Sequence, residues 1–193
     1  EAVAIDPLAY QLCLNQAKKD ALKIVAVINT HEHFDHTGGN TEIISVTGAK
    51  LYAHENAKKT INNVDFGLRA GNILNIGKTV QIEVLDTPGH TMSHICLLVR
   101  GKEDALFCGD TLFNAGVGNC HNGGDPLSLY NTFYNQLIKL DKKFGSDCES
   151  GIFNPRGFKK GTKDYENCLI TNYNNEQKKI IAKQKEAELL KKT

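Results

Sequence analysis

A short segment that follows the apolar run 24–28 concentrates metal-binding side chains in the order His31, His33, Asp35 and His36. Imidazole and carboxylate together are the ligands that zinc and iron favour in proteins. In an extended segment alternate side chains point the same way, so His31 and His33 are expected to point together. Asp35 and His36 can then turn toward a second point. The pattern predicts a buried strand that ends in a loop serving two adjacent metals; a solvated polar loop is the competing interpretation.

Two more candidate ligands follow strand-like runs further along the chain. His90 lies at the tip of the turn 86–91, and Asp110 follows the apolar run 105–108. Either residue alone is typical of a surface turn or a helix cap. Polar loops that follow the strands of a layered domain can gather at one edge of its sheet. We therefore expect both residues to join the first loop in a metal site, and His94, which precedes a strand, to pack or hydrogen-bond behind the ligands.

Strand-like and helix-like segments alternate along the 193 residues, a length that suffices for one substantial core. In the segment 80–85 apolar residues alternate with polar ones, which is typical of a half-buried strand. The alternation of strands and helices predicts a layered α/β domain. We expect strands at 24–29, 51–53, 80–85, 95–99, 105–108 and 150–153, helices at 7–19 and 126–140, another helix after 40, and a polar helical segment from 165 onward.

Composition bounds the classes of partner. The 23 lysines and arginines balance 22 aspartates and glutamates, so nothing favours nucleic acid, and no apolar run is long enough for a membrane span. The six cysteines are scattered without a CxxC pair, which favours a reducing intracellular compartment, the cytosol or the mitochondrion. From Arg156 onward ten basic and five acidic residues give a net charge of +5. This stretch is interpreted as a solvated helix face or as a docking site for an anionic partner.

Three segments together resemble the metallo-β-lactamase fold superfamily, and within it the glyoxalase II group, the hydroxyacylglutathione hydrolases. They are Asn29–Asn40 (NTHEHFDHTGGN), Thr87–Thr91 (TPGHT) and Phe107–Phe113 (FCGDTLF), and the resemblance extends over about residues 1 to 145. It implies a four-layer αβ/βα sandwich, with the strands that precede Ala2 and the C-terminal helical domain of the family both incomplete. We expect a metallo-β-lactamase-like domain over 1–155 and a short basic, mainly helical extension over 156–193.

The resemblance also implies a dinuclear centre of zinc, or of iron or manganese. Its residues would be His31, His33 and His90 on the first metal, Asp35 and His36 on the second, and Asp110 bridging the two. In such a centre metal-bound hydroxide attacks the carbonyl of a glutathione thioester and the thiolate leaves. The resemblance implies that Asp35 and Asp110 are the catalytic carboxylates. Asp35 could additionally orient the nucleophile.

One position departs from the family pattern. The family supplies a further histidine to the second metal from a Gly-His-Asp/Glu-Tyr segment, but this sequence has no histidine after His121. In the corresponding region, 155–167, Thr162 or Lys163 stands at the expected place. A lysine ammonium has no lone pair for a metal, and Asp164 could substitute only if the loop shifts. The first metal site is therefore expected to be complete and the second one weakened.

Substrate contacts depart as well. Asn119 and His121 stand where the family has basic and tyrosine residues that contact glutathione, and Tyr165 is a third candidate for substrate contact. A surface loop histidine is the alternative interpretation of His121. The part of the chain after Tyr165 has 28 residues, in place of the family's long helical domain.

Three functions remain open from the sequence. The first is a thioester hydrolase of glyoxalase II type with one strong metal site and one degenerate one. The second resembles persulfide dioxygenases of the same superfamily, whose single iron would be held by His31, His90 and Asp110. The third is a catalytically impaired subunit of a larger assembly, in which a partner covers the sheet edge near Ala2 or binds the basic C-terminal segment.

Overall fold

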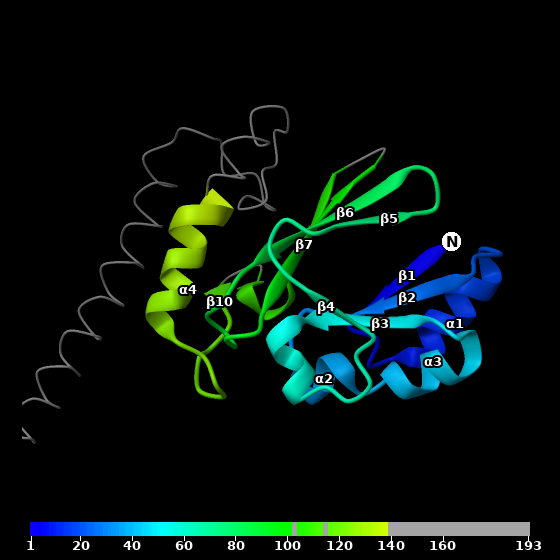
Figure 1. The fold of residues 1–193 in the computed structure, drawn as a ribbon, viewed down its shortest axis with the longest axis horizontal. Helices are drawn as coiled ribbons and strands as arrows, with labels where there is room; N and C mark the ends of the chain where they lie inside the picture. The colour runs from blue at the N-terminus through cyan, green and yellow to red at the C-terminus, as the bar shows by residue number, and fades with distance from the viewer. Residues whose placement is uncertain (102–103, 114–115, 139–193) are drawn as a thin grey trace, which may run out of the picture. The chain divides into compact units, whose positions relative to one another are not determined.

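The structure is a computed structural model that describes residues 1–101, 104–113 and 116–138. The predicted strand at 150–153, the domain boundary at 155 and the candidate residue Tyr165 lie outside the described residues. The described part contains two four-stranded sheets and one two-stranded ribbon. Figure 1 shows how these elements follow one another along the chain.

The first sheet is parallel and has the strand order β1-β2-β3-β4. Parallel neighbours need a crossover, and each crossover in this sheet contains a helix. A core of buried aliphatic side chains, among them Val27, Ile43 and Leu51, joins the sheet to residues of α1 and α3. The elements are β1 (Ala2–Ile5), α1 (Tyr10–Lys19), β2 (Ile24–Ile28), α2 (Phe34–Thr37), α3 (Asn40–Thr47), β3 (Lys50–His54), the 3₁₀ helix η1 (Glu55–Lys59) and β4 (Phe66–Leu68).

The second sheet is antiparallel and has the order β5-β6-β7-β8. In β6 Ile82 and Val84 are buried while Gln81 is exposed, so the half-buried strand predicted from the alternation is confirmed. Val84 lies opposite Leu97 of β7. The strands are β5 (Ile73–Ile76), β6 (Val80–Asp86), β7 (Ile95–Arg100) and β8 (Ala105–Phe107).

A second core lies between the two sheets. Ile28 and Leu68 of the first sheet cluster with aliphatic residues of β6 and β7, and Ile28 and Leu97 are fully buried. Two sheets packed face to face through such a layer, with helices outside one of them, make a layered α/β fold. The layered α/β class predicted from the sequence is therefore confirmed.

The last described helix docks at the end of β6. It is α4 (Pro126–Thr132), and the Asp125 carboxylate caps it by accepting a hydrogen bond from the Ser128 N–H. The chain continues as a π-helical turn, η3 (Phe133–Leu137). The Thr132 hydroxyl donates to the Pro88 carbonyl at 2.8 Å, so α4 is fastened to the loop that carries His90.

Several predicted boundaries shift. The helix expected from Pro7 begins at Tyr10, because Asp6 has a φ of 47° and Pro7 turns against Gly39 first. The short strands β4, β5, β9 (Leu112–Phe113) and β10 (Gly116–Val117) were not predicted, since none has more than four residues. Within the described ranges no helix is both long and apolar enough to cross a membrane.

Candidate metal centre

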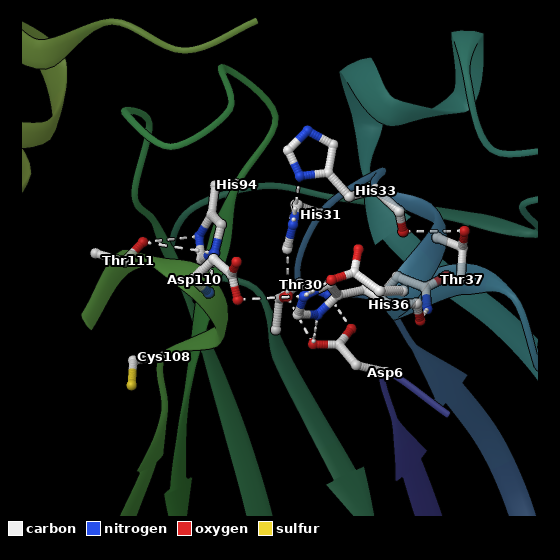
Figure 2. A network of polar contacts seen from close by, with 12 residues as sticks. Asp6, Thr30, His31, His33, His36, Thr37, His94, Cys108, Asp110 and Thr111 are labelled. Atoms are coloured by element: carbon white, nitrogen blue, oxygen red, sulfur yellow. Dashed lines mark hydrogen bonds and ion pairs between the residues drawn. The ribbon is translucent and has the colours of Figure 1, made fainter. Parts of the chain in front are cut away.

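Three loops bring histidine and aspartate side chains to one edge of the sheets. The first follows β2 and continues into α2, the second joins β6 to β7, and the third is the 3₁₀ turn η2 (Gly109–Thr111) after β8. Figure 2 shows that His31, His36 and Asp110 of the first and third loops point toward a common region. The convergence follows from topology, because each loop leaves a strand at the same edge.

Three imidazole nitrogens face one another in the first cluster. His33 Nδ1 lies 3.1 Å from His31 Nε2 and 3.0 Å from His90 Nε2. These residues form a group able to hold one ion. His31 and His33 therefore point together, as the alternation along the loop predicted.

Backbone carbonyls hold two of these rings from behind. His90 Nδ1 lies 2.6 Å from the Asn119 carbonyl oxygen, and His33 Nε2 lies 3.2 Å from the Asn122 carbonyl oxygen. A carbonyl oxygen can only accept, so both of these outer nitrogens carry a hydrogen. In the neutral rings the nitrogens that face the cluster, His90 Nε2 and His33 Nδ1, therefore carry a lone pair and no hydrogen.

Thr30 fixes the third ring in the same sense. Its hydroxyl donates to Asp6 Oδ2 at 2.7 Å and lies 3.0 Å from His31 Nδ1. Because the hydroxyl hydrogen is used by Asp6, His31 Nδ1 is the donor and His31 Nε2 presents a lone pair to the cluster. Burial, followed by the positive charge of neighbouring imidazoles, lowers the pKa of His31 to about 2. His31 is thus neutral, the form in which histidine binds metals.

The cluster fits a metal ion by its donors and their spacing. Three lone pairs at these separations repel one another unless a cation lies among them. Tetrahedral coordination with zinc–nitrogen bonds of about 2.0–2.1 Å places the nitrogens roughly 3.4 Å apart. The observed separations of 3.0 and 3.1 Å are close to that value. The donor set therefore suits zinc, and imidazole also suits iron.

Asp110 reaches from this cluster to a second one. Its Oδ2 lies 3.5 Å from His90 Nε2, and its Oδ1 lies 3.2 Å from His36 Nε2. His31, His36 and Asp110 form the second group able to hold an ion. One carboxylate thus has an oxygen near each cluster, which is the arrangement that a bridging ligand requires.

Asp6 orients His36, and the sequence did not single it out. Its Oδ2 lies 2.9 Å from His36 Nδ1, and its Oδ1 accepts the Thr30 N–H at 2.7 Å. Burial lowers the pKa of His36, but the hydrogen bond to Asp6 and the nearby carboxylates raise it more, so the net pKa is raised. The only sequence signal was an aspartate at a strand end before a proline, which also suits an ordinary turn.

Asp35 lies at the open side of the second cluster. Its side chain is 67% exposed, and its Oδ2 is 3.7 Å from His36 Nε2. It is the most exposed of the candidate metal ligands and is free to contact solvent.

Two further contacts tie the loops together, and neither was predicted. Asn29 and Asn40 exchange side-chain hydrogen bonds of 3.1 and 2.7 Å, and Asn29 also donates to the His36 carbonyl at 2.8 Å. The Glu32 carboxylate accepts a hydrogen bond of 2.9 Å from the Thr91 hydroxyl. The first loop is thereby fixed to α3 on one side and to the His90 loop on the other.

The candidate substrate residues lie beside the first cluster. Asn119 and His121 are exposed, and the Asn119 side chain accepts a hydrogen bond from the His121 N–H at 3.1 Å. Asn119 therefore touches the site through its carbonyl, on His90, and leaves its side chain outside.

Comparison with known proteins follows the same residues. Residues 3–149 match the model of the metallo-beta-lactamase superfamily. The chain belongs to this superfamily. Its members share the fold described above, and membership implies that the chain binds divalent metal.

Relatives within the superfamily are close over part of their length. The chain is 57% identical over 140 residues to a hydroxyacylglutathione hydrolase of Nitrosococcus oceani, covering 72% of this chain and 53% of the relative. It thus spans about half the length of the curated relatives it matches. Among solved structures, BLEG-1 B3 metallo-beta-lactamase has 25% identity and a TM-score of 0.62, over 67% of this chain and 71% of that one. ETHE1 from Myxococcus xanthus has 29% identity and a TM-score of 0.62, over 72% and 60%.

Proposed function

We propose that the chain is a metal-dependent hydrolase of glutathione thioesters, of the hydroxyacylglutathione hydrolase type. The observation that carries the proposal is the cluster of imidazole lone pairs on His31, His33 and His90, in which His33 Nδ1 lies 3.1 Å from His31 Nε2 and 3.0 Å from His90 Nε2. The identity of 57% to a hydroxyacylglutathione hydrolase supports the choice of substrate class. A glutathione substrate places the activity in a reducing compartment, the cytosol or the mitochondrion.

His31, His33 and His90 would hold the first metal, and His36 with Asp35 the second, with Asp110 shared between them. A bound divalent metal supplies hydroxide near neutral pH and polarises the carbonyl that the hydroxide attacks. Zinc is the proposed ion because three imidazole nitrogens with one carboxylate oxygen are a donor set that it favours.

The protein's own carboxylates then orient the reaction. Asp110 has one oxygen 3.5 Å from His90 Nε2 and the other 3.2 Å from His36 Nε2, so a single carboxylate links the two clusters. Asp35 Oδ2 is an exposed acceptor 3.7 Å from His36 Nε2 and is placed to accept a hydrogen bond from the attacking water. Asp6 keeps a hydrogen on His36 Nδ1 and so leaves His36 Nε2 free as a ligand atom.

The two sites are proposed to differ in strength. The first has three nitrogen donors held by oxygen acceptors behind them. The second has His36 and Asp110, with Asp35 as an exposed third group, and the sequence provides no histidine after His121. We therefore expect one tightly bound metal per chain and a second that is removed first by a chelator.

Metal analysis and thioester hydrolysis test the proposal together. The purified chain is expected to contain zinc and to hydrolyse an acyl-glutathione, as measured by thiol release. His33→Ala is expected to abolish both, because it removes the nitrogen shared by the two contacts of the cluster. His121→Ala is the matched control for metal content alone, since it removes an exposed histidine of the neighbouring loop.

The other outcomes separate the competing functions. A folded wild-type chain without metal refutes the hydrolase and favours a catalytically impaired subunit of a larger assembly. A single iron, with oxygen consumption on a glutathione persulfide and no thioester hydrolysis, favours the dioxygenase instead. Two tightly held metals would refute the proposed weakness of the second site while leaving the hydrolase in place.

A further inference from the structure

His94 lies under the Asp110 turn and uses both of its ring nitrogens on the protein. The Asp110 backbone N–H donates to His94 Nε2 at 3.2 Å. His94 Nδ1 lies 2.9 Å from the Thr87 hydroxyl and 3.0 Å from the Thr111 hydroxyl. Figure 2 shows His94 beside Asp110 and Thr111. The ring therefore connects the β6–β7 loop to the turn that follows β8.

These contacts fix one tautomer of His94. A backbone N–H can only donate, so His94 Nε2 is the acceptor and the ring hydrogen is on Nδ1. That hydrogen is donated to a threonine hydroxyl, either Thr87 or Thr111. Both nitrogens of His94 are thus engaged away from the clusters, and His94 is in neither group able to hold an ion.

The packing leaves His94 no freedom to move. The ring is fully buried and stacks on His31, with centroids 5.1 Å apart and an interplanar angle of 25°. Gly109 approaches it so closely that a Cβ there would lie 2.7 Å from His94 Nε2 and 2.5 Å from the Thr30 hydroxyl. Gly109 also has a φ of +45°, a conformation that favours glycine. The Gly109–Thr111 turn therefore packs in close contact with the His94 ring.

We propose that His94 is a positioning residue for Asp110: its Nε2 holds the Asp110 backbone N–H and thereby fixes where the carboxylate meets His36 and His90. The inference rests on the proposed function, because it concerns how tightly Asp110 helps to hold metal. His94 itself binds neither metal nor substrate. A fixed backbone keeps one Asp110 oxygen near each cluster, at 3.2 and 3.5 Å, without further cost when metal enters.

Two conservative variants distinguish the contact made by His94 Nε2 from the contact made by His94 Nδ1. In His94→Gln an amide oxygen can reach the position of Nε2 and accept the Asp110 N–H. In His94→Asn the shorter amide can reach the Thr87 hydroxyl, as Nδ1 does, but falls short of Asp110. The matched control is His54→Leu. His54 is also buried near strand ends. Its Nε2 lies 3.2 Å from Asp86 Oδ1 without hydrogen-bond geometry, and no contact with Asp110 is seen among the described residues.

The measurements are zinc affinity, by competition with a chromophoric chelator, and the visible spectrum of the Co²⁺-loaded chain. Urea unfolding of the metal-free chain reports folding separately. Loss of a residue that orients a metal ligand typically lowers metal affinity by about 10- to 100-fold. We expect a loss of that size in His94→Asn, together with a changed Co²⁺ spectrum. His94→Gln is expected to restore both, and His54→Leu to change neither.

The outcomes are distinguishable from failure of the proposed function. A wild-type chain that binds no zinc refutes both proposals. A wild-type chain that binds zinc, with His94→Asn equal to it in affinity and spectrum, refutes the positioning role alone. Equal losses in His94→Gln and His94→Asn also refute it, because the effect would then not depend on the Nε2 contact.

Discussion

Acidification from pH 7 to pH 5 is expected to destabilise the metal-free chain strongly, because two buried histidines resist protonation. Burial, followed by the charge of neighbouring imidazoles, lowers the pKa of His31 to about 2 and the pKa of His94 to about 3. Both side chains are fully buried. In the unfolded chain each takes up a proton as the pH falls through about 6.5.

The magnitude follows from proton linkage. Below pH 6.5 the unfolded state binds about two more protons than the folded state, and each costs roughly 1.4 kcal/mol per pH unit. Between pH 7 and pH 5 the free energy of unfolding should therefore fall by about 4 kcal/mol, a large share of a typical 5–15 kcal/mol. His36 acts in the opposite sense. Because its pKa is raised, its contribution is fully present below pH 6.5 and is lost as the pH rises through its folded pKa.

Urea unfolding of the chelator-treated chain at pH 7, 6 and 5 measures this slope. His94→Gln removes one of the two buried rings and should about halve the loss of stability on acidification. His121→Gln removes an exposed histidine and should leave the slope unchanged. A wild-type unfolding free energy that is constant between pH 6.5 and pH 5 would refute the claim that both rings are buried in the neutral form.

Three further changes test the packing around the centre. Asp6→Asn should lower the free energy of unfolding by about 2–4 kcal/mol, measured by urea unfolding, because charge-assisted hydrogen bonds contribute roughly 1.5–3 kcal/mol each. An amide nitrogen facing His36 Nδ1 should also favour the other His36 tautomer and so weaken binding of the second metal in a chelator competition. Gly118→Ala should displace its loop, because a Cβ there would lie 1.9 Å from the Asp110 carbonyl oxygen; wild-type stability and metal affinity in this variant would contradict the placement of the loop. Ile28→Ala should lower the free energy of unfolding by about 2–5 kcal/mol through the cavity left between the sheets, and a cost below 1 kcal/mol would argue against that core.

The convergence of the histidine loops was predictable because it depends on strand order and on side chains that carry metal chemistry. His31 and His33 follow β2 of the parallel sheet. His90 and Asp110 follow β6 and β8, which both run antiparallel to β7 and therefore end at the same edge of the second sheet. Alternation along an extended loop then correctly gave the common direction of His31 and His33. His94, which precedes an apolar run, was expected to pack or hydrogen-bond behind the ligands, and its Nε2 accepts the Asp110 N–H.

The remaining parts of the site depend on contacts that leave no such pattern. Asp6 reaches Thr30 and His36 only because β1 pairs with β2 and the chain then turns through a positive φ. The carbonyls of Asn119 and Asn122 are backbone groups, so the residue types at those positions say nothing about them. The short strands escaped because a period of two cannot be recognised over two to four residues.

In the loop 118–124 some substitutions would disturb the support of the His90 and His33 rings and others would not. Asn119 and Asn122 support His90 and His33 through atoms that every residue possesses, while their side chains take no part in that support. The close approaches of Gly118 and Gly124 to the backbone around Asp110 and His90, and the φ of +88° at Gly123, restrict residue type there. If the proposed function holds, substitutions elsewhere in the loop can therefore change which thioester is selected without displacing the His90 and His33 rings.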